Sequence, residues 1–456
     1  MSDAERVPWR RWDGHLAVLA ETIALRVGDA PLAGAVAEHA RLVFLDTLGC
    51  AIAGRAAPEV RALEAEAAAR EPGPIRLPGG AALALRPAIQ ILAIGPTWHE
   101  ACEGHAFAHG RPGIATIAAL LPLALVRDAT LAALIDALVL GYEVGARAGG
   151  WLRINPGLHV DGNWPGLGAA AGVAGLLGLD APAVKRAVDI AACQLPSSLY
   201  LPIRSGRSVR NTYLAHSALL GLDAALAAQA GFDAPPDALG WYAEHGCRAV
   251  TEALPPASTS LILDAYLKPF AAVRHVHYGA IAARRLRDRL GGDTRGIRGI
   301  VLDVYEEATV YCDNPRPATL LAAQFSLTFG VAAMLRTGAV DAGSYAPGVF
   351  DDAELRRLEA LVQVRADPVL TQAGQRGARL TVTVADGTLS EAVGGDDPDL
   401  LPTREGARAK FARNLAGVVA PARAGSFFEA VLAADGDRPL RGIWSDLLDA
   451  ASAGPV

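Results

Sequence analysis

In the first half of the chain, apolar residues recur at intervals of three and four positions, and Gly or Pro separates one run from the next. This spacing is typical of α-helices that bury one face. It predicts helices at residues 35–53, 114–125, 131–148 and 214–230. We therefore expect residues 16–240 to be mostly α-helical.

One stretch in this half, residues 166–178, contains five glycines among thirteen residues. Each glycine lowers helix stability by roughly 1 kcal/mol relative to alanine. A helix with this composition therefore needs another source of stability that offsets this loss. We expect it to pack so closely on its neighbours that larger side chains would clash.

After about residue 263 the pattern changes. Residues 297–305 and 380–384 alternate apolar and polar side chains, which is typical of half-buried strands. Ala385-Asp386-Gly387 has the composition of a hairpin turn. Helical spacing at 317–338 and 352–364 separates the two strands, so this part is predicted to be α+β.

The chain becomes helical again after Pro402, at residues 407–415 and 425–434. We expect these helices to return and pack on the first region. The predicted fold is mostly α with an inserted α+β domain. A helical main domain spans residues 1–264 and is completed by 401–456, and residues 265–400 form a smaller lid domain with the substrate cleft between the two.

Composition narrows the class of protein. With 456 residues, of which 52% are hydrophobic, the chain can bury a large core. Its net charge of −6 is spread along the sequence, so no nucleic-acid surface is indicated. The sequence has neither a signal-peptide pattern nor an uninterrupted membrane span, and its five cysteines form no CxxC pair. We expect a cytoplasmic protein with reduced thiols and no membrane or nucleic-acid partner.

Candidate chemistry is concentrated in two loop segments. Three of the ten histidines lie within eleven residues, at His99, His105 and His109, beside Glu100 and Glu103. A further histidine lies in the turn-rich segment 155–162. Histidine is the side chain whose unperturbed pKa lies nearest neutrality, so this pattern favours acid–base chemistry.

Five stretches together resemble the MmgE/PrpD family, which includes 2-methylcitrate dehydratase, cis-aconitate decarboxylase and iminodisuccinate epimerase. They occur in the family's order over nearly the whole chain. These stretches are LDTLGCAIAG at 45–54, GYEVG at 141–145, GLH at 157–159, KPF at 268–270 with Arg274 and His277, and AQFSL at 323–327.

The resemblance implies a homodimer built from a helical domain and a smaller α+β lid. It also implies metal-free, cofactor-independent chemistry next to a substrate carboxylate. Such chemistry needs a base and cations around the carboxylates. By their match to family positions and by their chemistry, the candidate catalytic residues are His159, as the base that removes the α-proton, with Lys268, His109 and Glu103. The candidate substrate-binding residues are Arg210, Arg274, His277, His105, Asn211 and Gly162.

Three departures from the family pattern bear on the substrate. Cys102 precedes Glu103 where dehydratases and decarboxylases of the family carry paired aspartates, so one carboxylate remains. Arg210 stands where many members have lysine, and arginine acts as a carboxylate clamp rather than a base. Phe329 replaces an expected tyrosine and has no hydroxyl to donate.

We expect a hydro-lyase acting on a small di- or tricarboxylate of the 2-methylcitrate or aconitate type, with Glu103 or His109 assisting the departing hydroxyl. An epimerase or a decarboxylase of a similar substrate would share the first intermediate, and the sequence leaves these alternatives open. Two further alternatives are a metal-dependent hydrolase built on the His99–His109 segment and a catalytically idle scaffold. Gly104, Gly110 and Pro112 argue against the helix that such a metal site requires.

Overall fold

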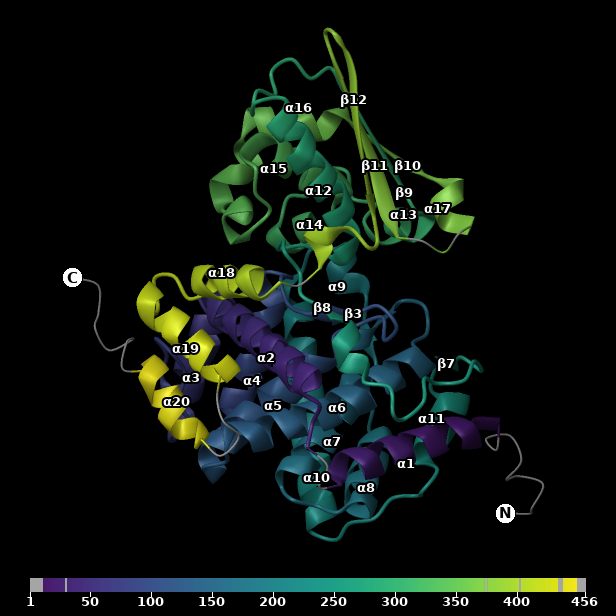
Figure 1. The fold of residues 1–456 in the computed structure, drawn as a ribbon, viewed down its shortest axis with the longest axis vertical. Helices are drawn as coiled ribbons and strands as arrows, with labels where there is room; N and C mark the ends of the chain where they lie inside the picture. Colours follow the sequence, from purple (N-terminus) through teal and green to yellow (C-terminus); the bar gives the residue numbers. More distant parts are fainter. Residues whose placement is uncertain are drawn as a thin grey trace.

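The computed structural model describes residues 11–28, 31–372, 374, 376–401, 403–433 and 438–448. A large helical domain carries a smaller α+β domain (Figure 1). The helices that precede the α+β domain are α1 (Asp13–Val27), α2 (Gly34–Gly54), α3 (Pro58–Arg70), α4 (Leu85–Trp98), α5 (Pro112–Arg127), α6 (Leu131–Trp151), α7 (Pro165–Leu176), α8 (Ala181–Ala192), α9 (Leu201–Arg204), α10 (Tyr213–Gln229) and α11 (Ala238–His245). The four helices expected from the apolar period correspond to α2, α5, α6 and α10.

The glycine-rich helix α7 lies at the centre of the main domain and packs against α5, α6, α8 and α10. A Cβ on Gly168 would lie 2.6 Å from the carbonyl oxygen of Gly141 in α6, and a Cβ on Gly141 would lie 2.6 Å from the carbonyl oxygen of Gly168. Both glycines are therefore required by a close approach of the two helix backbones. The prediction of unusually tight packing is confirmed.

Short antiparallel strand pairs connect loops of the main domain. They are β1 (Ile75–Arg76) with β2 (Ala82–Leu83), β3 (Gly104–His105) with β8 (Ala265–Tyr266), β4 (Leu152–Arg153) with β7 (Arg248–Ala249), and β5 (Leu158–His159) with β6 (Ser198–Leu199). The last pair holds the histidine of the second loop segment. The pair β3–β8 ties the first loop segment to the start of the α+β domain.

The α+β domain has its own hydrophobic core, which begins at Phe270 and ends at Leu400. Its sheet has the order β10-β9-β11-β12, with β10 parallel to β9 and the other neighbours antiparallel. The strands are β9 (Gly299–Val304), β10 (Val362–Ala366), β11 (Gly377–Val384) and β12 (Gly387–Gly394), and the helices are α12 (Arg274–Arg289), α13 (Glu306–Tyr311), α14 (Leu320–Gln324), α15 (Leu327–Thr337), α16 (Ala353–Leu361) and α17 (Pro368–Gln372). The hairpin predicted at Ala385–Gly387 joins β11 to β12.

Two predicted helices of this domain are wrong in part. The stretch 317–338 contains two helices, because Ser326 leaves the helical conformation and its side chain caps α15 by accepting from the Phe329 N–H. The stretch 352–364 is helical only to Leu361. Val362 and the residues after it pair with β9 as the edge strand β10, where alternate side chains are buried by the sheet rather than by a helix face.

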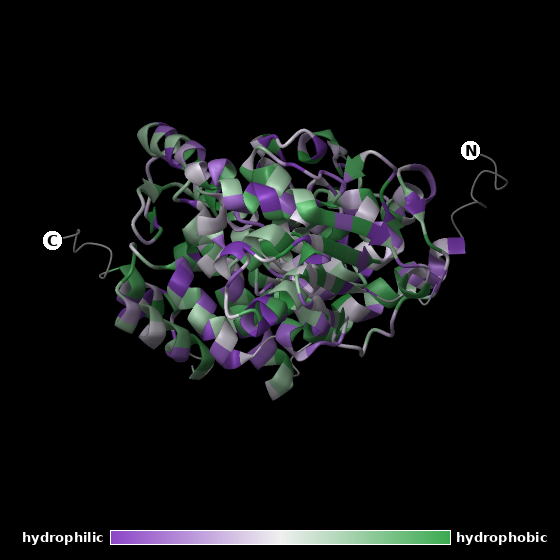
Figure 2. Ribbon diagram, turned by 90° about the horizontal axis from the view of Figure 1, so that it is seen from above, coloured by the Kyte–Doolittle hydropathy of each residue, from purple (hydrophilic) through white to green (hydrophobic). Residues whose placement is uncertain are grey.

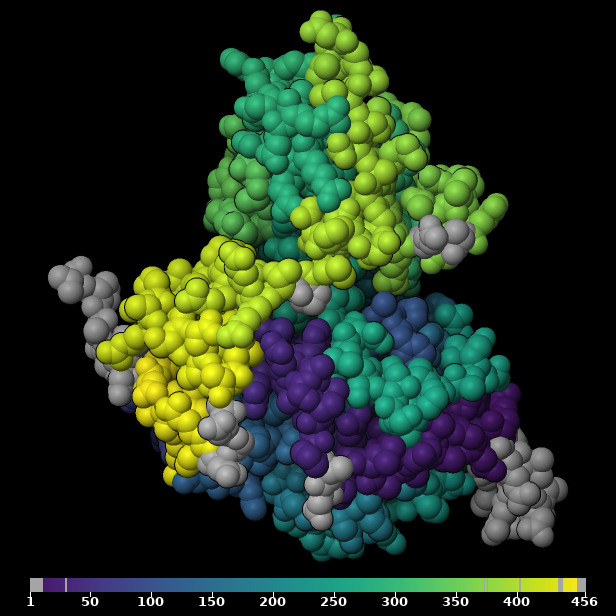
Figure 3. Space-filling model, in the orientation of Figure 1, coloured from purple at the N-terminus to yellow at the C-terminus, as the bar shows by residue number. Residues whose placement is uncertain are grey.

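After the α+β domain the chain returns to the main domain as α18 (Arg404–Asn414), α19 (Pro421–Ala433) and α20 (Leu440–Leu448). Both α18 and α19 contact α2, as expected, and Figure 3 shows these C-terminal helices in yellow beside the purple N-terminal segment. The mostly α fold with a smaller α+β domain is thus the observed one. The exact boundaries at 264/265 and 400/401 stay a prediction.

The outer helices alternate hydrophilic and hydrophobic residues, as Figure 2 shows in a view from above. Within the part of the chain that the structure describes, no helix combines the length and the apolar character needed to cross a bilayer. All five cysteines are free thiols: Cys50, Cys102, Cys193, Cys247 and Cys312.

Candidate active site

A cavity of about 330 Å³ lies where the two domains meet. Its walls are formed by the loop after α4, the segment around β5, and the first turn of α12. Seven cationic side chains and three carboxylates line it. The cations are Arg111, Arg153, Arg210, Arg248, Lys268, Arg274 and Arg376, and the carboxylates are Glu100, Asp161 and Glu307. This excess of positive charge suits an anionic ligand.

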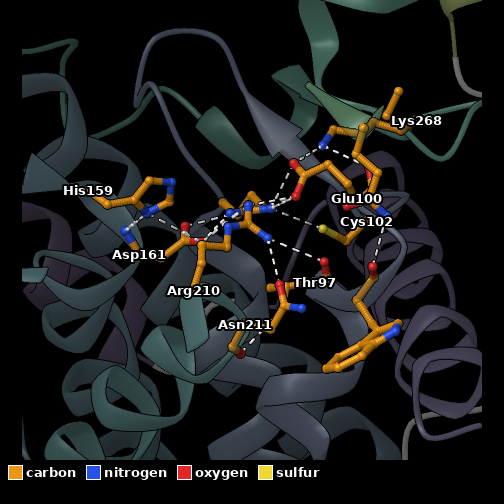
Figure 4. A network of polar contacts seen from close by, with 12 residues as sticks. Thr97, Glu100, Cys102, His159, Asp161, Arg210, Asn211 and Lys268 are labelled. Atoms are coloured by element: carbon orange, nitrogen blue, oxygen red, sulfur yellow. Dashed lines mark hydrogen bonds and ion pairs between the residues drawn. The ribbon is translucent and has the colours of Figure 1, made fainter. Parts of the chain in front are cut away.

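Glu100 is the centre of the charged network on the main-domain side (Figure 4). Its carboxylate accepts hydrogen bonds from Arg111 at 2.8 Å, from Arg210 at 2.6 Å and from Lys268 at 2.7 Å. Burial by itself raises the pKa of Glu100, but these three cations outweigh it and hold the pKa well below its ordinary value. Glu100 is therefore an ionised, buried counter-ion.

The backbone at Glu100 is unusual. α4 ends at Trp98, and Glu100 follows with a φ of +52°, a left-handed conformation that glutamate seldom adopts. The ion pairs of the side chain and the hydrogen bond from Lys268 Nζ to the Glu100 carbonyl oxygen hold it there. Such local strain persists only where the surroundings fix it, and it concentrates at functional sites.

Asp161 is the second anion of the network. Arg111 binds its carboxylate with both Nε and Nη2, and Arg210 Nη2 lies 3.6 Å from Oδ2. Burial raises the pKa of Asp161, but Arg111, His159 and Arg210 together bring it below the ordinary value. Three buried cations therefore face two buried carboxylates on this side of the cavity.

His159 lies at the end of β5, opposite Lys268 across the network (Figure 4). Its Nδ1 accepts a hydrogen bond from the Asp161 N–H at 3.2 Å and lies 3.6 Å from the Asp161 Oδ2. Burial lowers the pKa of His159 to about 4, against the opposing effect of Asp161. The imidazole is therefore neutral at pH 7, as a base requires.

The α+β domain contributes the first turn of α12 to the cavity. The Arg274 guanidinium lies over the rings of Tyr266 and Tyr278, 4.4 and 5.6 Å from their centroids, and within the described residues its buried Nη1 has no hydrogen-bond partner. The next residue, His275, also lines the cavity and bonds Tyr305 through Nδ1. Arg376 lines the cavity as well and pairs with Glu307 at 3.1 Å.

The structure brings six of the sequence-predicted residues to the cavity wall and leaves four outside it. Those at the wall are His159, Lys268, His109, Arg210, Arg274 and His105. His109 reaches it from a turn with a φ of +53°. His105 uses both ring nitrogens in the fold, accepting from the Ala108 N–H and bonding the Leu261 carbonyl.

The four residues outside the wall make contacts within the fold. Glu103 is fully buried, where its carboxylate accepts from the Gly113 N–H and the Tyr142 hydroxyl. Asn211 accepts from Arg210 Nη1 and so helps to orient it. His277 bonds the Ala272 carbonyl, and Gly162 lies against Ser198, with which a Cβ would collide.

Burial raises the pKa of Glu103 to about 7, because its donors are a neutral amide and a phenol rather than cations. Glu100, three residues earlier on the same loop, has the opposite shift. The two glutamates thus have different roles. Glu100 is ionised at the cavity, whereas Glu103 caps the start of α5 away from it.

The three departures from the expected pattern have structural explanations. Cys102 is buried, with its Sγ 3.7 Å from Arg111 Nη1. Arg210 does clamp a carboxylate, but one that belongs to Glu100. Phe329 stacks on Tyr345 in the core of the α+β domain and does not line the cavity. A hydroxyl at position 329 would thus be distant from a ligand in this cavity.

Sequence reasoning missed four important residues. Arg111 and Asp161 lie inside the two loop segments it singled out, where their charges were the available signal. Glu100 counts among the acid–base groups of the first segment and in the metal alternative, but not among the predicted site residues. His275 was passed over for its neighbour His277, because a linear pattern does not show which side of α12 faces a cavity. In the described part of the chain, no three His, Cys, Asp or Glu side chains are grouped to hold a metal.

Comparison with known families gives two matches that together cover most of the chain. The model of the MmgE/PrpD N-terminal domain matches residues 19–253, and that of the MmgE/PrpD C-terminal domain matches residues 270–435. Among curated proteins, no match is found.

Proposed function

The chain belongs to the MmgE/PrpD family, and from this premise we propose that it is a hydro-lyase that removes an α-proton from a small di- or tricarboxylate without a cofactor. Family membership supports an enzyme of the dehydratase or lyase type. The observation that carries the finer proposal is the cavity between the domains, in which a neutral imidazole lies beside seven cations.

The cations match the electrostatic demand of this reaction. Removal of a proton next to a carboxylate creates a second negative charge on the same group, and preorganised cations stabilise that charge as it forms. The network around Glu100 and Asp161 carries one net positive charge, because these two carboxylates face the three cations Arg111, Arg210 and Lys268. The α+β side adds Arg274.

We assign the role of base to His159. To accept a proton at Nε2, the ring must carry its other proton on Nδ1, and Asp161 Oδ2 lies 3.6 Å from Nδ1. A small rotation of the ring would exchange the backbone N–H contact for the carboxylate. Asp161 then stabilises the imidazolium that forms, as a carboxylate behind a catalytic histidine does.

The departing hydroxyl needs a proton. Position favours His109, which lines the cavity while Glu103 does not, but burial lowers the pKa of His109 to about 4 and raises that of Glu103 to about 7, so protonation at pH 7 favours Glu103. Both remain candidates for this step. Epimerisation would use the same first step with reprotonation on the opposite face, and decarboxylation would replace deprotonation with loss of CO2. The proposal favours dehydration and keeps these two as alternative outcomes of the same site.

Proton NMR in D2O tests this proposal. Purified, EDTA-treated protein would be incubated with 2-methylcitrate, citrate and cis-aconitate, with the His159→Gln variant alongside. We expect alkene formation or deuterium incorporation with at least one acid, and a loss of about 10²-fold or more in the variant. His216→Gln, on the exposed surface of α10, is the matched control.

The outcomes separate the candidates. An alkene product supports the lyase, deuterium incorporation alone supports an epimerase, and CO2 release supports a decarboxylase. If the wild-type protein leaves every acid unchanged, or if His159→Gln retains full activity, the proposal is wrong.

Two further parts of the proposal are that the protein is a homodimer, as the family resemblance implies, and that its domains divide at 264/265 and 400/401, as the sequence pattern indicates. Sedimentation equilibrium measures the first. A mass near 47.2 kDa, that of one chain, would contradict the dimer.

A further inference from the structure

His275 occupies a position on the cavity wall that the proposed function leaves without a role. It lies in the first turn of α12, directly after Arg274, and is 92% buried. Burial, together with Arg376 and Lys268, lowers the pKa of His275 to about 3, so the ring is neutral at pH 7. A neutral imidazole has one nitrogen that donates and one that accepts, and its neighbours decide which is which.

Tyr305 makes this choice. The Tyr305 hydroxyl and His275 Nδ1 are 2.5 Å apart, and within the described residues the hydroxyl has no other hydrogen-bond partner. Burial raises the pKa of Tyr305, so the phenol keeps its proton. Because that proton has only Nδ1 as an acceptor, Tyr305 donates to Nδ1, and the proton of the His275 ring lies on Nε2.

The orientation of the ring is also fixed. Tyr311 stacks on His275 with an interplanar angle of 11° and a centroid distance of 5.9 Å, and the ring of Tyr305 packs at 5.6 Å. In the described part of the chain, Nε2 has no hydrogen-bond partner, although His275 lines the cavity. The fold therefore holds the Nε2–H group in a fixed orientation, and this donor makes no hydrogen bond within the described part of the chain.

The surroundings of this donor point to an oxyanion. Arg274, one residue earlier, has a buried Nη1 that is also without a partner among the described residues. The first backbone N–H groups of α12, a helix of 16 residues, lie in the same turn and carry the positive end of the helix dipole. The side chains of two consecutive residues in the first turn of α12 thus line the cavity, each with a donor that has no partner among the described residues.

We infer that Arg274 and His275 form a carboxylate subsite that the α+β domain contributes to the cavity, with His275 Nε2 donating to one carboxylate oxygen and Arg274 to the other. Tyr305 is a positioning residue, which acts by fixing the tautomer of His275. This inference rests on the proposed polycarboxylate substrate and extends it, because it assigns one substrate carboxylate to the smaller domain.

Such a subsite would select its ligand by hydrogen-bonding character. A donor-only pair accepts an ionised carboxylate and offers nothing to an amide nitrogen or an ammonium group. The substrate would therefore carry a second carboxylate, away from the carbon that loses its proton. Occupation of the subsite would also link the two domains through the ligand.

Calorimetric titration with citrate, cis-aconitate and 2-methylcitrate tests the subsite. We expect His275→Phe, which keeps an aromatic ring beside Tyr311 but has no N–H donor, to bind the best ligand about tenfold more weakly, since a hydrogen bond to a charged group is lost. His216→Gln on α10 should bind as the wild type does. If His275→Phe does not fold, Tyr305→Phe gives the decisive measurement, because it keeps the ring and removes only the hydroxyl.

Tyr305→Phe can also be tested by a measurement whose result would not change if Tyr305 had only a structural role. In protein labelled with ¹⁵N-histidine, two-bond ¹H–¹⁵N correlations distinguish the Nε2–H from the Nδ1–H tautomer. We expect the Nε2–H form for His275 in the wild type, a mixture of both forms in Tyr305→Phe, and weaker binding in step with the mixture.

The results keep this inference apart from the proposed function. Equal ligand affinity in His275→Phe and the wild type, or an Nδ1–H tautomer in the wild type, would overturn the subsite alone. Binding that depends on His275 without any turnover would support the subsite and contradict the lyase. Failure of the wild type to bind any of the three acids would overturn both.

Discussion

The two sides of the cavity differ in how their charges are balanced. On the side formed around Glu100 and Asp161, the cations Arg111, Arg210 and Lys268 are paired with these two carboxylates at hydrogen-bond distance. On the α+β side, Arg274 has a buried nitrogen without a partner among the described residues. We refer to the first as the paired side and to the second as the unpaired side. A cation without a partner among the described residues can bind an anionic ligand, whereas the paired cations are already held by buried carboxylates.

This comparison predicts different costs for substitutions on the two sides. On the paired side, loss of one partner leaves buried charges uncompensated and lowers stability. On the unpaired side, loss of a cation lowers ligand affinity and leaves stability nearly unchanged.

Glu100→Gln should have the largest effect. It leaves Arg111, Arg210 and Lys268 with one carboxylate, and removal of one partner from a buried ion pair costs about 3–5 kcal/mol. We expect a loss of that size in the free energy of unfolding, measured with urea, and loss of turnover.

Glu64→Gln is the matched control, because Glu64 forms a buried pair with Arg55 that does not line the cavity. It should lower stability but leave kcat and KM of the folded enzyme unchanged. Wild-type stability in Glu100→Gln would show that the cations are not held by this carboxylate.

Glu103 is buried like Glu100 but has no cationic hydrogen-bond donor among the described residues. It therefore tests whether cations, rather than burial, determine the ionisation of the buried carboxylates. Its pKa is raised to about 7 in the folded protein, so the folded state binds this proton more tightly than the unfolded chain does. The resulting stabilisation is complete below about pH 4.5 and is lost as the pH rises through 7.

Glu103→Gln removes this dependence. The free energy of unfolding of the wild type relative to the variant should fall by up to about 3 kcal/mol between pH 4.5 and pH 8, at roughly 1.4 kcal/mol per pKa unit. Urea titrations of both proteins across that range measure it. A difference that is constant with pH would mean that Glu103 is ionised throughout.

Arg274→Gln tests the unpaired side. We expect citrate affinity to fall about 10- to 100-fold, the effect of one hydrogen bond to a charged group, while the free energy of unfolding changes by less than about 1 kcal/mol. Arg289→Gln, at the far end of α12 in an exposed pair with Glu391, should bind citrate normally. A stability loss comparable to that of Glu100→Gln would remove the distinction between the two sides.

We expect the smallest effect in the decrease of kcat/KM at low pH. As a base, His159 must be unprotonated, and burial lowers its pKa to about 4. The value of kcat/KM should be half-maximal near pH 4 and fall about tenfold for each further unit. A midpoint near the ordinary histidine value of about 6.5 would place the base outside this buried site.

Much of the fold was predictable because its signals are local. The apolar period located α2, α5, α6 and α10, and the glycines of α7 indicated a close helix contact before its partner was known. The errors occurred where local and tertiary signals compete. Val362 and Val364 continue a helical pattern in sequence, but their pairing with β9 makes them a strand.

The site was predictable only in part. His159, Lys268 and Arg274, which belong to stretches that carry the family resemblance, lie at the cavity wall, and Arg210, at a position that departs from the family pattern, lies there too. Their roles stay a prediction. The choice between His275 and His277 was not accessible, since both lie in the first turn of α12 and only packing decides which one faces the ligand.

The sequence by itself determined the helical and α+β parts, the resemblance to the family, and the segments that hold the candidate site residues, because these follow from residue type and spacing along the chain. The tertiary structure alone decided which charges are paired. Glu100 and Glu103 are the same residue type on one loop, yet three cations ionise the first, and neutral donors in a buried site leave the second with a pKa near 7. That difference depends on groups from distant segments that meet only in the folded protein.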